Sequence, residues 1–209
     1  MMNYEILSKA SVLLGLAIIL LAGCARSPST KFYVLDSLSN SELEQEFAPS
    51  RRSFTIGVGP VRLPKYLDRP QIVTRLSRNE LQLAEFHQWA EPLGQNFSRV
   101  LAENLSLMSP ADRVVVFPWN HSTAVDFQVT VEILRFETRV GRESALTARW
   151  NIFKNDGKKL VMTDTSNFRE IVTTQDYETM VSAKSQVVAA LSREVAMAIT
   201  ALTQTPRGR

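Results

Sequence analysis

The sequence predicts an α+β protein in which an antiparallel β-sheet carries two main helices packed on one face. Two observations lead to this prediction. Several segments alternate apolar and polar residues, which is typical of strands with one buried face. Two longer segments repeat their apolar residues at intervals of three and four, which is typical of amphipathic helices. The predicted order is four strands, a helix, four strands and a second helix.

The first four strands are predicted from β-rich runs and the turns between them. The runs cover residues 32–35, 54–61, 71–76 and 80–84. Gly57 and Gly59 are interpreted as a feature of the second strand and not as a phosphate loop, because Pro60 has no backbone N–H to donate. Residues 77–79 are turn formers of a length suited to a hairpin between the third and fourth strands.

The first helix is predicted to start beside Pro92 and to end before Pro110. Its apolar stripe consists of Leu93, Phe97, Leu101, Leu105 and Met108. Two triplets that begin at Asn96 and Asn104 match the N-glycosylation pattern. Because both triplets fall inside this helix, they are interpreted as chance matches.

The second half of the chain is predicted to contain four more strands and a long helix. The strands cover residues 113–117, 125–138, 146–152 and 160–171. The last three are expected to form an antiparallel meander with a turn at residues 155–157. Asp176 is a good N-cap for the final helix, whose apolar stripe is broken only by Lys184.

Residues 1–23 are predicted to be a bacterial lipoprotein signal peptide. The apolar run at residues 12–21 is too short for a membrane span, which takes about 20 residues, but suits a secretory signal. It leads into a segment that resembles the recognition sequence of lipoprotein signal peptidase: Leu21, Ala22, Gly23 and Cys24. Cys24 is the only cysteine, and lipidation accounts for a thiol that has no disulfide partner in the chain. The alternative is an ordinary signal peptide or membrane anchor with an incidental cysteine.

We expect the mature protein to begin at Cys24, which carries diacylglycerol and an N-acyl group such as palmitate, and to need no other cofactor. Residues 24–30 are a lipidated terminus and short linker, and residues 31–205 form a single periplasmic domain. Residues 25–30 reach about 20 Å when fully extended, so the domain lies close to its membrane. Ala25, where aspartate would retain the protein in the inner membrane, favours the periplasmic leaflet of the outer membrane.

The composition and motifs give no sign of catalysis. A net charge of +3, spread along the chain, is too mild to indicate a nucleic-acid partner. Neither His87 nor His121 has the spacing of a metal site, and the chain lacks the Gly-x-Ser-x-Gly motif of serine hydrolases. Glu80, Glu85 and Glu91 lie near His87, but such residues usually solvate a loop. We expect neither an enzyme nor a metal site.

One long stretch carries a family resemblance. It comprises residues 56–61, 63–75, 89–93 and 100–105, together with Tyr33-Val34-Leu35 and the lipidation sequence. The stretch resembles the ABC-type transport auxiliary lipoprotein family, in its PqiC-like form, over nearly the whole mature chain. The resemblance implies a non-enzymatic outer-membrane lipoprotein that faces the periplasm. It also implies a partner, an MCE-domain protein that carries lipids between the two membranes.

A proline-bounded loop in this stretch is the candidate contact with a partner or with a second copy in a homo-oligomeric ring. Its residues are Tyr66, Leu67, Asp68 and Arg69. The alternative is that Tyr66 and Leu67 cap the sheet while Asp68 and Arg69 pair with each other. The expected function is a docking or auxiliary subunit of an intermembrane lipid transport system that supports outer-membrane integrity. Alternatives are a lipid-binding carrier, for which no spare internal volume is evident, and a lipid-anchored hydrolase.

Overall fold

The computed structural model describes Tyr4 and residues 28–39, 52–120 and 122–204. The strands are β1 (Lys31–Tyr33), β2 (Arg52–Arg62), β3 (Gln71–Arg75), β4 (Leu81–Trp89), β5 (Ala111–Val116), β6 (Phe127–Arg139), β7 (Glu143–Lys154) and β8 (Lys159–Ile171). The helices are α3 (Leu93–Met108) and α4 (Tyr177–Gln204). This order confirms the predicted succession of elements. Apart from Tyr4, the predicted signal peptide lies outside the described residues, and so do Cys24 and the polar segment 40–50.

The eight strands form one mixed sheet, so the prediction of an antiparallel sheet is wrong. β6 is central, with β7 along one edge, while β2 and β3 share the other edge. Both β2 and β3 run parallel to β6, β5 runs parallel to β2, and β1 runs parallel to β4. Residue alternation reports which face of a strand is buried and carries no information on strand direction. The prediction therefore had no means of detecting these parallel pairs.

The antiparallel elements that the sequence predicts are confirmed. β6, β7 and β8 form the meander. β3 and β4 form the hairpin, which the N–H of Leu76 closes by donating to the Glu80 carbonyl oxygen at 3.1 Å. β4 extends beyond the predicted residues 80–84, as far as Trp89, and its register with β3 shifts along the way.

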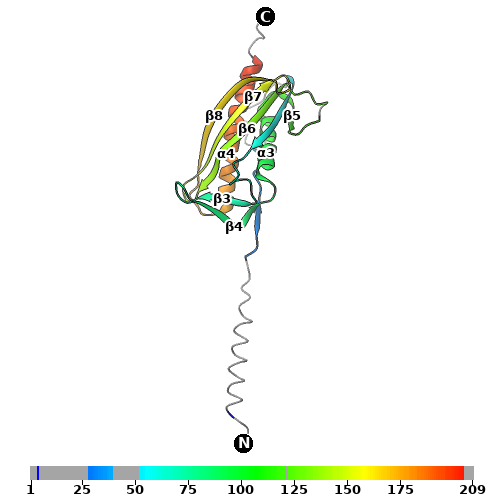
Figure 1. Ribbon diagram of the computed structural model, residues 1–209. Helices are drawn as coiled ribbons and strands as arrows, with labels where there is room; N and C mark the ends of the chain where they lie inside the picture. Colours follow the sequence, from blue (N-terminus) through cyan, green and yellow to red (C-terminus); the bar gives the residue numbers. More distant parts are fainter. Residues whose placement is uncertain (1–3, 5–27, 40–51, 121, 205–209) are drawn as a thin grey trace.

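Both helices cover the same face of the sheet, as predicted, and Figure 1 shows them on one side of the strands. Phe97 of α3 packs edge to face on Phe136 of β6, with ring centroids 5.7 Å apart. Trp150 of β7 projects from that same face, and its indole N–H donates to Ser166 at 2.9 Å. Ser166 in turn donates to Glu194 of α4 at 2.8 Å. The core therefore lies between one sheet face and the two helices.

The long helix α4 is the main core helix. Its N-terminus is capped as predicted, because the N–H of Thr179 donates to the Asp176 carboxylate at 2.9 Å. Although α4 is long and apolar enough to cross a membrane, its apolar stripe packs in the core, where Leu191 has no exposed surface. β1 and β4 lie at one end of the molecule, and the C-terminal end of α4 lies at the other (Figure 1).

Candidate functional site

The structure places the four predicted contact residues in two environments. Leu67 is buried and Tyr66 is half-buried, and both pack against the hydrophobic core. Asp68 is exposed and Arg69 is half-buried. Among the ion pairs of the described residues, none joins Asp68 to Arg69. The contact role of the loop stays a prediction, and it now rests on Asp68 and Arg69.

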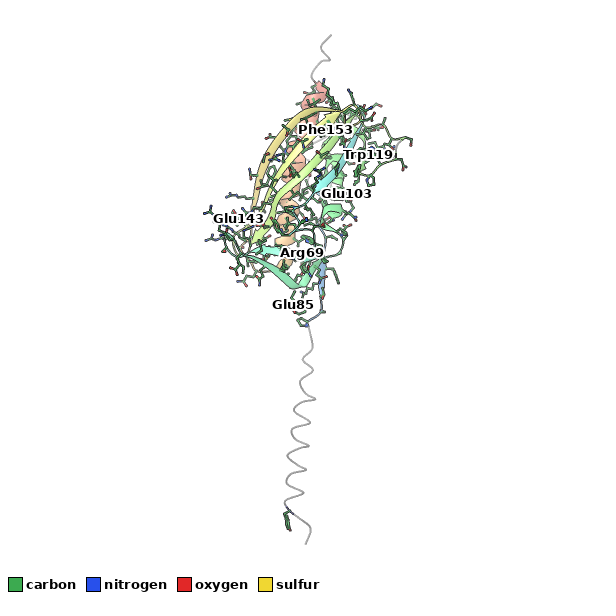
Figure 2. All side chains as sticks on the ribbon, viewed as in Figure 1. Arg69, Glu85, Glu103, Trp119, Glu143 and Phe153 are labelled. Carbon is green, nitrogen blue, oxygen red and sulfur yellow. The ribbon has the colours of Figure 1, made fainter. Side chains whose placement is uncertain are left out.

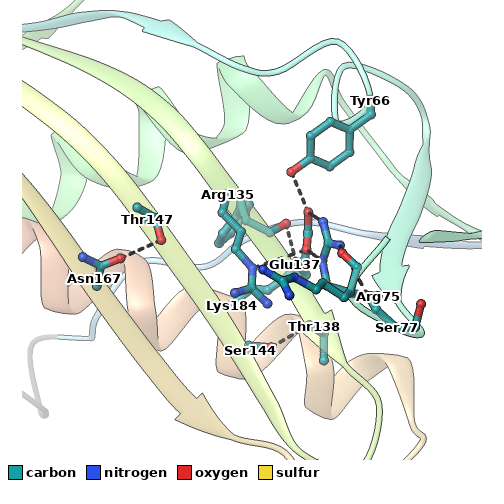
Figure 3. Close-up of polar contacts among 12 residues, drawn as sticks. Tyr66, Arg75, Ser77, Arg135, Glu137, Thr138, Ser144, Thr147, Asn167 and Lys184 are labelled. Carbon is teal, nitrogen blue, oxygen red and sulfur yellow. Dashed lines mark hydrogen bonds and ion pairs between the residues drawn. The ribbon is translucent and has the colours of Figure 1, made fainter. Parts of the chain in front are cut away.

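Tyr66 anchors the loop to a buried carboxylate on β6 (Figure 3). Its hydroxyl donates to Oε1 of Glu137 at 2.5 Å, and the Glu137 side chain has no exposed surface. Arg75 of β3 binds both oxygens, with Nη2 2.7 Å from Oε1 and Nε bonded to Oε2. Nε of Arg135 lies 3.4 Å from Oε2. The cluster joins the 66–69 loop, β3 and β6.

The electrostatics of this cluster indicate an anchor. Burial by itself raises the pKa of Glu137, but hydrogen bonds from Arg75 and Tyr66 and the charges of Arg75 and Arg135 outweigh it. The pKa of Glu137 therefore lies below its ordinary value. Burial, and next the hydrogen bond to Glu137, raise the pKa of Tyr66. The carboxylate is thus charged with both oxygens occupied, which stabilises the loop and does not suit a general base.

A surface cleft of about 670 Å³ lies beside the anchored loop, between the end of β2, the start of α3 and the end of β5. A smaller cleft of about 340 Å³ shares Asp68, Glu91 and Pro92 with it. Because the two clefts adjoin, we treat them as one and call it the β2–α3 groove. Its lining includes Gly59, Pro60, Leu63, Asp68, Arg69, Pro70, Trp89, Glu91, Pro92, Arg99, Val116 and Phe117.

The β2–α3 groove combines apolar walls with charged groups at its edge. Phe117 is 49% exposed. Arg99 lies 3.0 Å from Glu91 and 3.0 Å from Glu103, in pairs that are each partly exposed. Such exposed pairs contribute about 0 to 1 kcal/mol to stability, so a partner can replace them at little cost. This mixture is typical of a protein-binding surface.

Two glycines of β2 allow neighbouring aromatic residues to lie close to the strand. A Cβ on Gly59 would lie 2.8 Å from Cβ of Phe117, and one on Gly57 would lie 2.7 Å from the Trp119 ring. Gly59 also has a φ of +118°, which residues with a side chain rarely adopt. The interpretation of these glycines as a strand feature is confirmed. Their role is to seat the segment after β5 at the edge of the groove.

Two asparagines of α3 hold the segment that follows β1. The N–H of Leu35 donates to Oδ1 of Asn96 at 2.6 Å, and the N–H of Leu38 donates to Oδ1 of Asn104 at 2.9 Å. Both amide side chains are buried, so neither could carry a glycan. The sequence analysis missed this structural role. We call residues 33–38 with these two asparagines the N-terminal clamp.

The glutamates near His87 do not form an acid–base cluster. Nδ1 of His87 lies 2.8 Å from the Tyr33 hydroxyl, and its ring stacks on Tyr177 with centroids 3.8 Å apart. Glu91 instead accepts a hydrogen bond from Asn96 at 2.8 Å. Within the described residues no three His, Cys, Asp or Glu side chains could hold a metal ion. His121 is not among those residues.

The fold defines a class of α+β proteins that solved structures share. An uncharacterized protein matches with a TM-score of 0.65 and 21% identity, over 82% of this chain and 99% of its own. A protein from Xanthomonas campestris, assigned to DUF330, matches with a TM-score of 0.65 and 15% identity, over 83% of this chain and 98% of its own. At these identities the likeness is one of fold alone.

Comparison with family models identifies the chain more closely. The model described as an ABC-type transport auxiliary lipoprotein component matches residues 33–196. The chain belongs to this family, which confirms the resemblance found in the sequence. A comparison with curated proteins found no match. The N-terminal clamp, the Glu137 cluster and the β2–α3 groove all lie within the matched residues.

Proposed function

We propose that this lipoprotein is a docking subunit of an intermembrane lipid transport system, with an MCE-domain protein as its partner. It is anchored in the periplasmic leaflet of the outer membrane through acylated Cys24 and supports the integrity of that membrane. The observation that carries the proposal is the β2–α3 groove, where residues 59–61, 63, 68–70 and 89–92 of the family-like stretch come together. Membership of a transport auxiliary family supports the same function.

The walls of the groove are fixed by secondary structure and by the Glu137 cluster, so a partner can bind without rearranging them. One wall is β2, a second is the start of α3, and the 66–69 loop is fixed by the Glu137 cluster. A surface held in its bound conformation loses little conformational entropy on binding. Asp68 and Glu91 are the charged residues that line both clefts; Glu91 is paired with Arg99, whereas Asp68 is the exposed one of the two.

We also propose that several copies assemble into a closed ring that receives the end of the MCE partner. Anchoring raises the local concentration of the domain at the membrane, and this favours self-association. Identical subunits that pack head to tail close into a ring when their rotation permits. Light scattering on the domain from residue 25 onward measures the oligomer, and a parent that stays monomeric at high concentration contradicts the ring.

Reversing the charge of Asp68 is expected to weaken partner capture. Asp68→Lys should reduce recovery of an MCE-domain protein from detergent-solubilised envelopes by about tenfold, the loss that corresponds to about 1.4 kcal/mol of binding. Its thermal stability should stay near that of the parent, because Asp68 is exposed.

Asp164→Lys is the matched control, since Asp164 is exposed on the edge strand β8 and does not line the groove. It should capture the partner as the parent does. Equal recovery with both variants would contradict the groove as the docking site. Recovery of no MCE-domain protein with the parent would contradict the proposed partner.

Cys24→Ala is expected to abolish the anchor. Both acylation and cleavage depend on the thiol, so the variant should accumulate as an unprocessed precursor that incorporates no fatty acid. Metabolic labelling with a radioactive fatty acid measures this directly. Label in the variant, together with fractionation to the outer membrane, would show that the lipoprotein signal is wrong.

A further inference from the structure

Large apolar side chains are exposed at one end of the domain, which we call the base. The base comprises β1, β4, residue 34 and the turns that follow β3 and β6. Phe32 is 64% exposed and Val34 is 46% exposed, and Leu83 of β4 is 46% exposed. Figure 1 shows β1 and β4 opposite the C-terminal end of α4, and Figure 2 places Glu85 of β4 at the same tip.

Two further exposed apolar residues lie beside the turns that follow β3 and β6. Leu76 follows β3 in the hairpin turn and is 52% exposed. Ile171 is 78% exposed and is the cross-strand partner of Glu143, which Figure 2 shows on the flank of the domain, above Glu85. Single exposed apolar residues are common on protein surfaces, but a group gathered at one end indicates a contact.

An aromatic cluster supports the exposed residues from inside. Tyr33, His87 and Tyr177 are half-buried and lie together: Tyr33 is hydrogen-bonded to His87, Tyr177 stacks on His87, and the centroids of the two tyrosine rings are 6.4 Å apart. Phe32 lies between Lys31 and Tyr33 on β1, so the strand that carries it is held by this cluster. Rings with an apolar body and a polar tip favour the interface between membrane and water.

The length of the tether limits what can cover the base. Only residues 25–27 separate Cys24 from Pro28, where the described chain resumes, and the four Cα–Cα steps between these two residues span at most about 14 Å. Beyond Pro28, Asn96 and Asn104 fix the chain by their hydrogen bonds to Leu35 and Leu38. The base can therefore move away from the anchor only if the N-terminal segment unfolds, and this would break the N-terminal clamp.

The charges at the base do not favour a strongly anionic surface. Around the base the basic and acidic residues are about balanced: the basic ones include Lys31, Arg78, Arg139, Arg142 and Arg169, and the acidic ones include Glu80, Glu85, Glu143, Asp176 and Glu178. A contact made by basic residues would need an excess of positive charge. The apolar and aromatic side chains are the groups that can attach this end to lipid.

We propose that the base lies directly on the lipid bilayer, with Phe32 and Val34 inserted among the headgroups beside acylated Cys24. This inference rests on the lipid anchoring in the proposed function. The contact adds a second attachment to the acyl chains and sets the orientation of the domain. The C-terminal end of α4 then points away from the membrane, into the periplasm.

Tryptophan fluorescence with brominated lipid tests the contact. The mature acylated protein is reconstituted in phosphatidylcholine vesicles with or without bromine on the acyl chains near the glycerol. The fluorescence of the introduced tryptophan is the signal of the variant minus that of the parent. Brominated vesicles should quench this signal several-fold more in Phe32→Trp than in Leu160→Trp. Leu160 is 51% exposed at the opposite end, where it pairs with Phe153 (Figure 2). The parent in the same vesicles supplies the background from the native tryptophans.

The outcomes separate this contact from the anchor itself. Vesicle-bound, acylated protein in which both added tryptophans are quenched equally would overturn the contact but leave the anchor intact. Phe32→Trp that is shielded from aqueous iodide but not quenched by brominated lipid would also overturn it, because protein would then cover the base. Mass spectrometry of the same preparation reads acylation at Cys24, and an unmodified terminus would contradict the proposed function.

Discussion

Leu191→Asp is expected to unfold the domain. Leu191 has no exposed surface and lies in the main hydrophobic cluster, which joins α3, α4 and the sheet. A carboxylate there would be buried without a partner, at a cost of several kcal/mol. Because a domain of this kind is stable by only about 5 to 15 kcal/mol, one such change removes much of the margin.

Thermal unfolding followed by circular dichroism measures this effect. Met197→Asp is the matched control, because Met197 lies on the same helix and is 57% exposed. The control should melt near the parent, while Leu191→Asp should be unfolded or melt far lower. If Leu191→Asp melts at the same temperature as the parent and the control, the apolar stripe of α4 does not pack in the core.

Local periodicity accounts for what the sequence predicts well. The helix expected between Pro92 and Pro110 is α3, Leu93–Met108, because a proline and an apolar repeat are signals within a few residues. The β6, β7 and β8 meander and the turn at residues 155–157 are signalled equally locally. Strand direction is different, because it depends on how distant elements connect, and the parallel pairs of β2 and β3 with β6 escaped prediction for that reason.

The candidate site was predicted only in part for the same reason. The family-like stretch already contains Asp68, Tyr66 and Arg75, but nothing local shows that two of them converge on Glu137. Alternation continued from Val131 and Ile133 would place Glu137 on the core face, but the register of β6 shifts after Ile133 and turns Glu137 to the other face, where a charged residue is ordinarily solvated. Its burial results from the 66–69 loop and β3 covering that end of the strand. A buried carboxylate of this kind becomes visible only when the tertiary contacts are known.

The break that Lys184 makes in the apolar stripe of α4 marks a buried charged residue. The lysine interrupts the apolar stripe of α4, and its side chain is buried. Nζ donates to the Phe136 carbonyl oxygen at 3.0 Å and lies 4.3 Å from the centroid of the Phe136 ring. Burial lowers the pKa of Lys184 to about 7, although the charge of Glu137 partly opposes this shift.

This lowered pKa makes stability depend on pH in a defined window. In the unfolded chain Lys184 has its ordinary pKa of 10.5, so between pH 7 and that value the unfolded state binds more protons than the folded state. Stability contributed by this group therefore rises with pH across the window. Below pH 7 the lysine is charged in both states, and the folded state bears the full cost of burying the charge.

Lys184→Met is accordingly expected to stabilise the domain below pH 7 and to remove this rise in stability between pH 7 and 10.5. Replacing a buried charge by an apolar side chain of similar length stabilises by about 1 to 4 kcal/mol in favourable cases. The lost hydrogen bond to Phe136 offsets about 1 kcal/mol of that gain. Urea unfolding at a series of pH values measures both effects, with Lys159→Met as the control because Lys159 is exposed on β8. A Lys184→Met variant that is less stable than the parent below pH 7, or that keeps the parent's slope above it, would show that the buried charge does not limit stability.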